Sequence, residues 1–327
     1  MLMAAASAGT GKLAAVWRVW APLAVLGALC LLISVFSPNF LTVSNLLRLL
    51  NSASIPMILS VGATFVILLG SIDLSLEGIV SVSAVVVSML VANDVTGVAI
   101  GLWAVPLAVF LGSLMGLING VLHVWLRTPS FMTTLGVGFA GVGVATAVLQ
   151  GVTVRISDQN FRAISLGRIL DVPMAVWIAA VTIGIAWVIQ ERLRLGRWVI
   201  ALGTDELTAR HVGIPVERTR IIVFALAGAF YGLGGVLSAA QFGQGNALIG
   251  QGRLFTTITA VVVGGTALSG GSGSVLNTVA GVLIVVVLAN GMVLMGVPPF
   301  VQQGVQGVLI ITAVAMSLDR SRLDVVK

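Results

Sequence analysis

Long apolar runs constrain the fold of this chain more than any other feature. About ten stretches of roughly 20 residues are almost free of charge, and a helix needs about that length to cross a membrane. Only 9% of the 327 residues are charged and 58% are hydrophobic, whereas soluble domains carry roughly 25% charged residues. So few charges cannot cover a water-facing surface. We therefore predict an all-α polytopic membrane protein whose solvent is largely lipid.

Ten predicted spans define the organisation of the chain. They cover residues 19–36, 46–69, 77–93, 98–126, 130–150, 174–191, 220–242, 254–268, 275–296 and 300–317. We interpret the first run as a retained helix and not a signal peptide, because it is long and no small-residue cleavage motif follows it. The chain then divides into an N-terminal segment (1–18), one transmembrane domain (19–317) and a tail (318–327).

Basic residues predict the orientation. With the N-terminus in the cytoplasm, twelve basic residues fall inside, and the five that fall outside are Arg48, Arg155, Arg162, Arg168 and Arg253. Cytoplasmic segments of membrane proteins carry the excess of Lys and Arg. Both termini and the connecting loop 192–219 are therefore predicted to be cytoplasmic. The longest external loop is 151–173, which is polar enough to meet water or a soluble partner.

One predicted span is short. The apolar part of 254–268 runs into a glycine cluster that includes Gly264, Gly265 and Gly270. Such a segment is typical of a half-helix or re-entrant element, which is tolerated at membrane depth only inside protein or beside water. The alternative is a complete span followed by a flexible cytoplasmic turn, and the sequence leaves both open.

Glycines four residues apart predict close helix contacts. They occur at Gly112, Gly116 and Gly120, and again at Gly228 and Gly232. Small residues at this spacing form a flat stripe that another backbone can approach. We interpret both stripes as packing within the bundle, with a contact between subunits as the alternative.

The sequence holds no catalytic or metal-binding pattern. It lacks G-x-x-x-x-G-K-[ST], so the chain does not hydrolyse ATP itself, and it lacks H-E-x-x-H and G-x-S-x-G. Its single cysteine, Cys30, and its separated histidines, His123 and His211, form no metal site. All carboxylates, Asp73 and Glu77 included, fall in predicted loops or at helix ends, which disfavours an ion-driven carrier. We expect no enzyme activity, no metal and no cofactor bound by this chain. We also expect no nucleic-acid partner, because the basic residues flank apolar segments.

Charge is concentrated in 201–220, where six of twenty residues are charged. The sequence TDELTARHVGIP predicts a short helix with Thr204 or Asp205 as N-cap. Gly213 suits the left-handed position after the last turn, and Pro215 prevents continuation. A helix of about two turns is not stable alone. We interpret it as a docking element, with an ordinary solvated loop as the alternative.

Four stretches together carry a family likeness over about residues 40–320. They are LGSIDLSLEG (69–78), PSFMTTLG (129–136), ALGTDELTARHVGI (201–214) and AVVVGGTALSGGSGSV (260–275). In this order the chain resembles the permease subunit of bacterial ATP-binding-cassette (ABC) importers for monosaccharides, the ribose-permease type. It departs from that pattern at Asp205, where Asn is frequent, and at Leu254 and Thr256, where acidic residues are frequent.

The resemblance implies a set of partners. A coupling helix at 204–213 would sit in a cleft of a separate cytoplasmic ATP-binding subunit, which uses the ATP. The residues that match this motif are Thr204, Asp205, Glu206, Arg210 and Gly213. A second permease chain, identical or paralogous, would complete the pore, and an external sugar-binding protein would deliver the sugar. The protein would lie in the bacterial inner membrane.

Polar or aromatic residues in or beside spans are candidates for lining the path. They are Asn51, Ser54, Phe131, Thr133, Thr134, Gln241, Asn246 and Asn277. The alternative for each is an interhelical hydrogen bond or packing. For function, the alternatives are an ABC permease for branched-chain amino acids or nucleosides, and a stand-alone secondary carrier. Nothing in the residues supports a membrane scaffold or enzyme.

Overall fold

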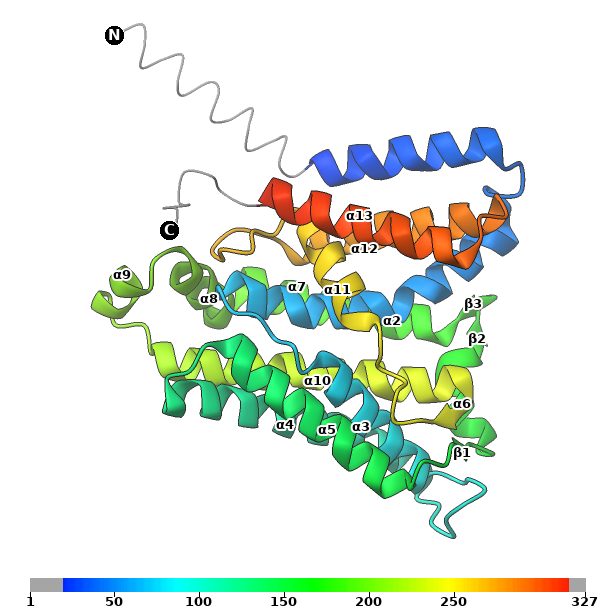
Figure 1. The fold of residues 1–327 in the computed structure, drawn as a ribbon, viewed down its shortest axis with the longest axis horizontal. Helices are drawn as coiled ribbons and strands as arrows, with labels where there is room; N and C mark the ends of the chain where they lie inside the picture. Colours follow the sequence, from blue (N-terminus) through cyan, green and yellow to red (C-terminus); the bar gives the residue numbers. More distant parts are fainter. Residues whose placement is uncertain (1–19, 318–327) are drawn as a thin grey trace, which may run out of the picture.

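The computed structural model describes residues 20–317, and it is a bundle of helices, most of which lie roughly along one direction, while α3, α5 and α11 are inclined to it (Figure 1). Within these described residues, six helices are long and apolar enough to cross a membrane. They are α2 (Val43–Leu68), α4 (Ala104–Leu126) with its leading turn η1 (Gly101–Trp103), α5 (Ser130–Leu149), α7 (Met174–Arg192), α10 (Val216–Phe242) and α12 (Val275–Leu294). The all-α polytopic class is thereby confirmed. The predicted segments 1–18 and 318–327 lie outside the described residues.

Four further helices account for the other predicted spans. They are Trp20–Phe36, α3 (Leu76–Leu90), α11 (Arg253–Val263) and α13 (Pro299–Ser317). At about 1.5 Å per residue, the 15 residues of α3 and the 11 of α11 extend roughly 22 and 16 Å. Both lengths are below the roughly 30 Å of a hydrocarbon core. For the segment 254–268, this length favours the half-helix over a complete span.

The segments α2–α3 and α10–α11 have the same arrangement of a long helix, a return segment and a short helix, and they run in opposite directions. After α2 the chain turns back through 69–75 before α3 begins, and α3 packs on α4 and α5. After α10 it turns back through 243–252 before α11 begins, and α11 packs on α12 and α13. Figure 1 shows α2 and α10 running antiparallel through the centre. Inverted repeats with interrupted helices at their junction are a recurring design of membrane transporters.

The glycine stripes are used within this chain. A Cβ on Gly112 would lie 2.6 Å from the carbonyl oxygen of Gly228 and 2.8 Å from the Cα of Gly232. A Cβ on Gly120 would lie 2.7 Å from the Cα of Ile221. The interpretation as bundle packing is confirmed, because α4 and α10 occupy each other's stripes and leave no room for another subunit there.

One end of the bundle, which we call the α6 end, is built by the loop 151–173. The strand β1 (Val154–Arg155) pairs antiparallel with β4 (Gln244–Gly245), which follows α10. Helix α6 (Gln159–Leu166) follows, and then β2 (Arg168–Ile169) and β3 (Val172–Pro173) form a hairpin. Asp158 caps α6, because its Oδ1 accepts a 3.0 Å hydrogen bond from the Phe161 amide. The predicted loop 151–173 therefore has regular secondary structure and forms the α6 end of the bundle.

The opposite end, the α9 end, carries α8 (Arg194–Thr204) and α9 (Glu206–His211). The sequence prediction treats 192–219 as one connecting loop around a short helix, and it is wrong for α8. Several predicted boundaries also differ from the observed ones: α4 begins at Ala104 instead of near 98, α10 begins at Val216 instead of 220, and α11 ends at Val263 instead of 268. The apolar criterion missed the beginning of α10 because its first turns contain the charged residues Glu217, Arg218 and Arg220.

Candidate functional site

The short helix α9 is capped by Asp205. Its Oδ1 accepts hydrogen bonds from the amides of Leu207 (3.0 Å) and Thr208 (3.3 Å), and its Oδ2 accepts one from the Thr208 hydroxyl (2.6 Å). The side-chain bond from Thr208, followed by its backbone bond, lowers the pKa of the Asp205 carboxyl. Of the two predicted caps the structure selects Asp205, because the Thr204 hydroxyl donates instead to the Ile200 carbonyl at 2.8 Å.

The end of α9 follows the predicted pattern. Gly213 has a φ of +82°, a left-handed conformation that glycine adopts without steric cost. Pro215 directly precedes α10 and is its N-cap. The segment 204–215 is therefore a helix with a defined beginning and a defined end, as its sequence predicts.

The charges around α9 pair with one another. Arg210 Nη2 lies 2.8 Å from Glu217 Oε1 and 3.4 Å from Glu206 Oε1. Arg220 Nη2 of α10 lies 2.5 Å from Glu206 Oε2. The prediction that Glu206 and Arg210 contact a partner stays a prediction. In this chain both residues fasten α9 to the beginning of α10.

The outer surface of α9 is apolar. The side chains of Leu207 and Val212 are 70% and 71% exposed, whereas Ala209 faces inward with 2% exposed. Exposed large apolar residues on a short projecting helix mark an interaction site better than paired charges do. The sequence analysis missed Leu207 and Val212 because it selected the docking residues by the concentration of charge in 201–220.

Helix α8 lies directly against two other chain segments. Gly203 has no room for a side chain, because the Leu68 carbonyl and the Gly271 amide occupy the position of a Cβ. The Gly271 amide donates a 2.8 Å hydrogen bond to the Leu68 carbonyl. The glycine-rich segment 264–274, which follows α11, therefore lies between α8 and the end of α2.

The same segment is held by Gln190 of α7. The Gln190 Nε2 donates to the Gly273 carbonyl at 3.0 Å, and its Oε1 accepts from the Val275 amide at 2.8 Å. Gln190 is 4% exposed, so these bonds are shielded from water. The arrangement can transmit a displacement of α8 to α11.

Inside the bundle, α3 and α11 begin next to each other. The Leu254 amide donates a 3.1 Å hydrogen bond to Glu77 Oε1, so the carboxylate of one short helix satisfies the first turn of the other. A carboxylate is favourable at both positions, because the N-terminal end of a helix carries partial positive charge. The prediction that Glu77 lies at a helix end is correct, but this helix end lies within the bundle.

Asp73 also lies inside, in the return segment before α3. It is 6% exposed, and its Oδ1 accepts hydrogen bonds from the Ser75 amide (2.9 Å) and hydroxyl (2.6 Å). Asn119 of α4 donates a 2.7 Å hydrogen bond to the same hydroxyl. The motif residues of 69–78 thus form a buried polar junction between α3 and α4.

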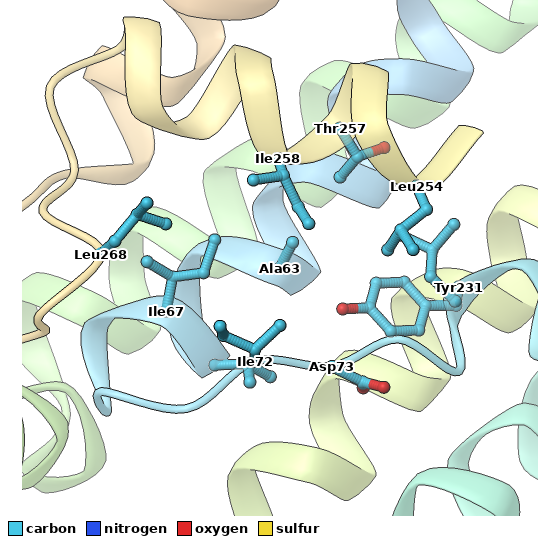
Figure 2. Close-up of a pocket in the computed structure, with 11 residues that line it drawn as sticks. Ala63, Ile67, Ile72, Asp73, Tyr231, Leu254, Thr257, Ile258 and Leu268 are labelled. Carbon is cyan, nitrogen blue, oxygen red and sulfur yellow. The ribbon is translucent and has the colours of Figure 1, made fainter. Parts of the chain in front are cut away.

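A cavity of about 110 Å³ lies between α2, α10 and α11 (Figure 2). Its lining is apolar except for Asp73, Tyr231 and Thr257. In Figure 2 the Tyr231 hydroxyl points towards the centre of the cavity. Ligand sites usually measure about 300–1,000 Å³. This cavity is too small and too apolar to be the passage for a polar solute, and it holds none of the predicted path residues.

A larger hollow, of about 440 Å³, lies at the α6 end beside the first turns of α2. Of the predicted path residues it contains Asn51, together with Arg48, Arg168 and Asp171. Because two exposed arginines and one carboxylate line it, this hollow carries a net positive charge.

The structure does not bring the other predicted path residues together. Ser54 donates to the Leu50 carbonyl at 2.8 Å within α2, and Thr134 accepts from the Leu74 amide at 2.9 Å, which joins α5 to the return segment before α3. Thr133 bonds Thr128 at 2.8 Å. These bonds agree with the alternative of interhelical and local hydrogen bonding.

The remaining four lie in different places. Phe131 is 42% exposed on α5, and Gln241 is half-buried in the last turn of α10. Asn246 donates a 3.1 Å hydrogen bond to Thr153 at the α6 end. Asn277 lies in the first turn of α12 at the other end. The eight residues form no single passage.

Comparisons with known proteins agree with this geometry. The family described as the permease component of branched-chain amino acid transport systems matches residues 45–314. The chain is 35% identical to the ribose import permease protein of Escherichia coli strain K12, over 86% of this chain and 88% of the relative. It is 31% identical to the D-allose transport system permease protein of the same strain, over 92% and 91%. It is 30% identical to the L-arabinose transport system permease protein, over 91% and 90%. No solved structure matches.

Proposed function

The chain belongs to the permease family of branched-chain amino acid transport systems, and we propose that it forms the membrane passage of an ABC importer for a monosaccharide. It is a multi-pass protein of the bacterial inner membrane and has no ATPase site of its own. The named relatives are permeases for ribose, D-allose and L-arabinose, which supports a monosaccharide over a branched-chain amino acid or a nucleoside. ATP would be used by a partner subunit, and we expect this chain to bind no cofactor.

The observation that carries the proposal is the construction of α9. Asp205 caps it, Glu206 and Arg210 anchor it to α10, and Leu207 and Val212 project from it. Buried aromatic or aliphatic anchors with a polar rim are typical of protein interfaces. We assign Leu207 and Val212 to the contact with the cytoplasmic ATP-binding subunit. Thr204, Asp205, Glu206, Arg210 and Gly213 shape and hold the element.

A route for coupling follows from the contacts of α8. A movement of α9 displaces α8, whose Gly203 touches Leu68 of α2 and Gly271 of the glycine-rich segment. That segment continues directly from α11, the short helix that begins inside the bundle. ATP-driven closure of the partner would then move α11 and α2 against the rest of the bundle. Movement of one part of a helix bundle against another is a common way for transporters to switch between outward-open and inward-open states.

The positions of the elements support the predicted topology. We assign the α9 end to the cytoplasm and the α6 end to the outside. Counting α3 with its return segment and α11 with its own, ten segments enter the membrane and both termini are cytoplasmic. The basic residues of 192–220 support this side, as the positive-inside rule requires. An external sugar-binding protein would meet the α6 end, and a second permease chain would complete the passage.

Co-purification tests the docking assignment. The double variant Leu207→Ser with Val212→Ser removes the apolar tip and leaves every ion pair of α9 in place. A matched control is Val152→Ser, which changes a valine that is 57% exposed at the opposite end. We expect the ATP-binding subunit to co-purify with the wild type and the control but not with the double variant. Equal recovery from all three would contradict the assignment.

A further inference from the structure

The arginine at the beginning of α11 lies at an unusual depth. Arg253 is the first residue of α11, whose 11 residues extend roughly 16 Å from the glycine-rich segment at the α9 end. The neighbouring Leu254 amide is bonded to Glu77, from which α3 extends to the α6 end. Both measures place Arg253 near the middle of a hydrocarbon core of about 30 Å. This depth disagrees with the prediction that Arg253 falls outside the membrane.

The surroundings of Arg253 leave part of its guanidinium without a partner. Its Nε donates a 3.2 Å hydrogen bond to the Ile249 carbonyl. Within residues 20–317, no carboxylate lies at ion-pair distance from Arg253. The residue is half-buried, so part of it reaches the surface of the chain.

This surface cannot face lipid. A guanidinium at the bilayer centre is costly unless it faces water or a polar partner. At this depth its side chain is too short to reach either membrane surface. Gln251, two positions earlier, is exposed, and its amide adds a second polar group that hydrocarbon cannot solvate. The surface around Arg253 therefore borders water or another polar surface within the membrane.

The shape and chemistry of this surface suit a sugar. Phe255 is 61% exposed, and no described atom lies within 4 Å of the position of a Cβ on Gly252, so the chain leaves open space at this glycine, three positions before the aromatic residue. Arginine and glutamine supply several hydrogen-bond donors and one acceptor for hydroxyl groups. An aromatic face offers apolar contact to the C–H face of a pyranose or furanose ring.

We propose that Gln251, Arg253 and Phe255 border the water-filled translocation path at mid-membrane, and that the sugar contacts them as it passes. The inference rests on the proposed function for the identity of the solute. The wet surface itself rests only on depth, exposure and charge. Because this surface is open on one side, the sugar would contact it transiently and would not be enclosed in a pocket.

Cysteine accessibility tests the wet surface without any transport. In a Cys30→Ser background, Gln251→Cys and Phe255→Cys are placed in lipid nanodiscs and treated with a hydrophilic, charged methanethiosulfonate reagent. Val181→Cys is the control for a non-aqueous surface, because it lies in the middle of α7 and is 63% exposed. Leu170→Cys, 84% exposed on the β2–β3 turn, is the control for water access.

We expect Gln251→Cys and Phe255→Cys to react at a rate close to that of Leu170→Cys and far above that of Val181→Cys. Rates as slow as that of Val181→Cys at both positions would overturn the proposal. This outcome is independent of whether the protein moves sugar, so it distinguishes a failure of this inference from a failure of the proposed function.

Uptake measurements test the contact with the solute. The variants Arg253→Leu and Arg253→Gln are compared in cells supplied with ribose, D-allose or L-arabinose. We expect Arg253→Leu to lower uptake of the transported sugar by about tenfold or more, because the passing sugar loses hydrogen bonds from a charged donor. Arg253→Gln keeps two donors and should retain more activity. Equal uptake by the wild type and Arg253→Leu would contradict the contact, and recovery of the ATP-binding subunit shows that each variant is assembled.

Discussion

Arg220 of α10 and Glu206 of α9 form a contact between two helices, with Nη2 and Oε2 2.5 Å apart. Arg220 is the less exposed partner, with 26% of its side chain accessible against 39% for Glu206. Because α9 has only six residues, such a contact has to hold it in place. The direction in which Leu207 and Val212 project therefore depends on a residue of the neighbouring spanning helix.

Removing this contact should loosen α9. Arg220→Leu leaves Glu206 with Arg210 alone, at 3.4 Å. We expect faster hydrogen exchange at the amides of α9 and reduced co-purification of the ATP-binding subunit. Arg218→Leu is the matched control, because Arg218 is exposed on the same turn and forms no ion pair in the described part of the chain. Identical exchange in the two variants would contradict the anchoring role.

Acidification should act on α9 through Asp205. Its hydrogen bonds lower the pKa of the carboxyl in the folded helix relative to the free side chain. The stabilisation is therefore complete above the ordinary pKa of an aspartate, about 4, and is lost as the pH falls through the lower folded value. Hydrogen exchange at Leu207 and Thr208 should accelerate below about pH 4 in the wild type, after correction for intrinsic rates.

The Asp205→Asn variant separates the cap from the charge. Asparagine is an equally good N-cap and does not titrate in this range. We expect its α9 exchange to show a smaller step than the wild type between pH 5 and pH 3, a range chosen to bracket the ordinary pKa of about 4. The remaining step would come from loss of the Arg210–Glu217 ion pair, which this variant keeps. A step of the same size in Asp205→Asn would assign the pH dependence to another group.

Glu77 should stabilise the junction of the two short helices. Glu77→Leu leaves the Leu254 amide without its acceptor, and an unsatisfied buried donor costs about 1–3 kcal/mol. Thermal unfolding in detergent should shift to lower temperature and sugar uptake should fall. Glu77→Gln keeps a carbonyl oxygen for this bond and should lose much less. A Glu77→Leu variant as stable as the wild type would show that the bond contributes nothing.

The glycine contact between α4 and α10 should not tolerate a side chain. Gly112→Val would place Cβ 2.6 Å from the Gly228 carbonyl oxygen, and overpacking of this kind typically costs about 1–3 kcal/mol or more. We expect poor recovery of monodisperse protein. Gly143→Val on α5 is the control, because no described atom lies within 4 Å of that Cβ position. Recovery of Gly112→Val equal to that of the control would contradict the packing.

The sequence predicts the elements whose signals are local. Apolar length identifies the spanning helices, and Asp205, Gly213 and Pro215 mark α9 correctly because caps depend on neighbouring residues. The same local reasoning could have predicted helix α8. Val199 and Leu202 are buried on one face of it, at helical spacing, but the basic residues beside them suggested a loop.

The features that the sequence did not predict depend on contacts between residues far apart in the chain. The bond between Glu77 and Leu254 joins residues 177 positions apart, and no local pattern announces it. The path candidates were chosen for polarity near spans, yet Ser54 bonds within its own helix, and Thr134 accepts a bond from Leu74, 60 positions away. The depth of Arg253 becomes visible only once α11 is known to begin inside the bundle.

Reconstitution tests the central claim most directly. The purified chain is placed in proteoliposomes alone, or with its co-purified ATP-binding subunit and sugar-binding protein, and uptake of labelled ribose, D-allose and L-arabinose is measured. We predict concentrative uptake of at least one sugar only with the partners and ATP, and its loss with Leu207→Ser and Val212→Ser. Uptake by the chain alone, down a sugar gradient or with a proton gradient, would contradict the claim and identify a stand-alone carrier.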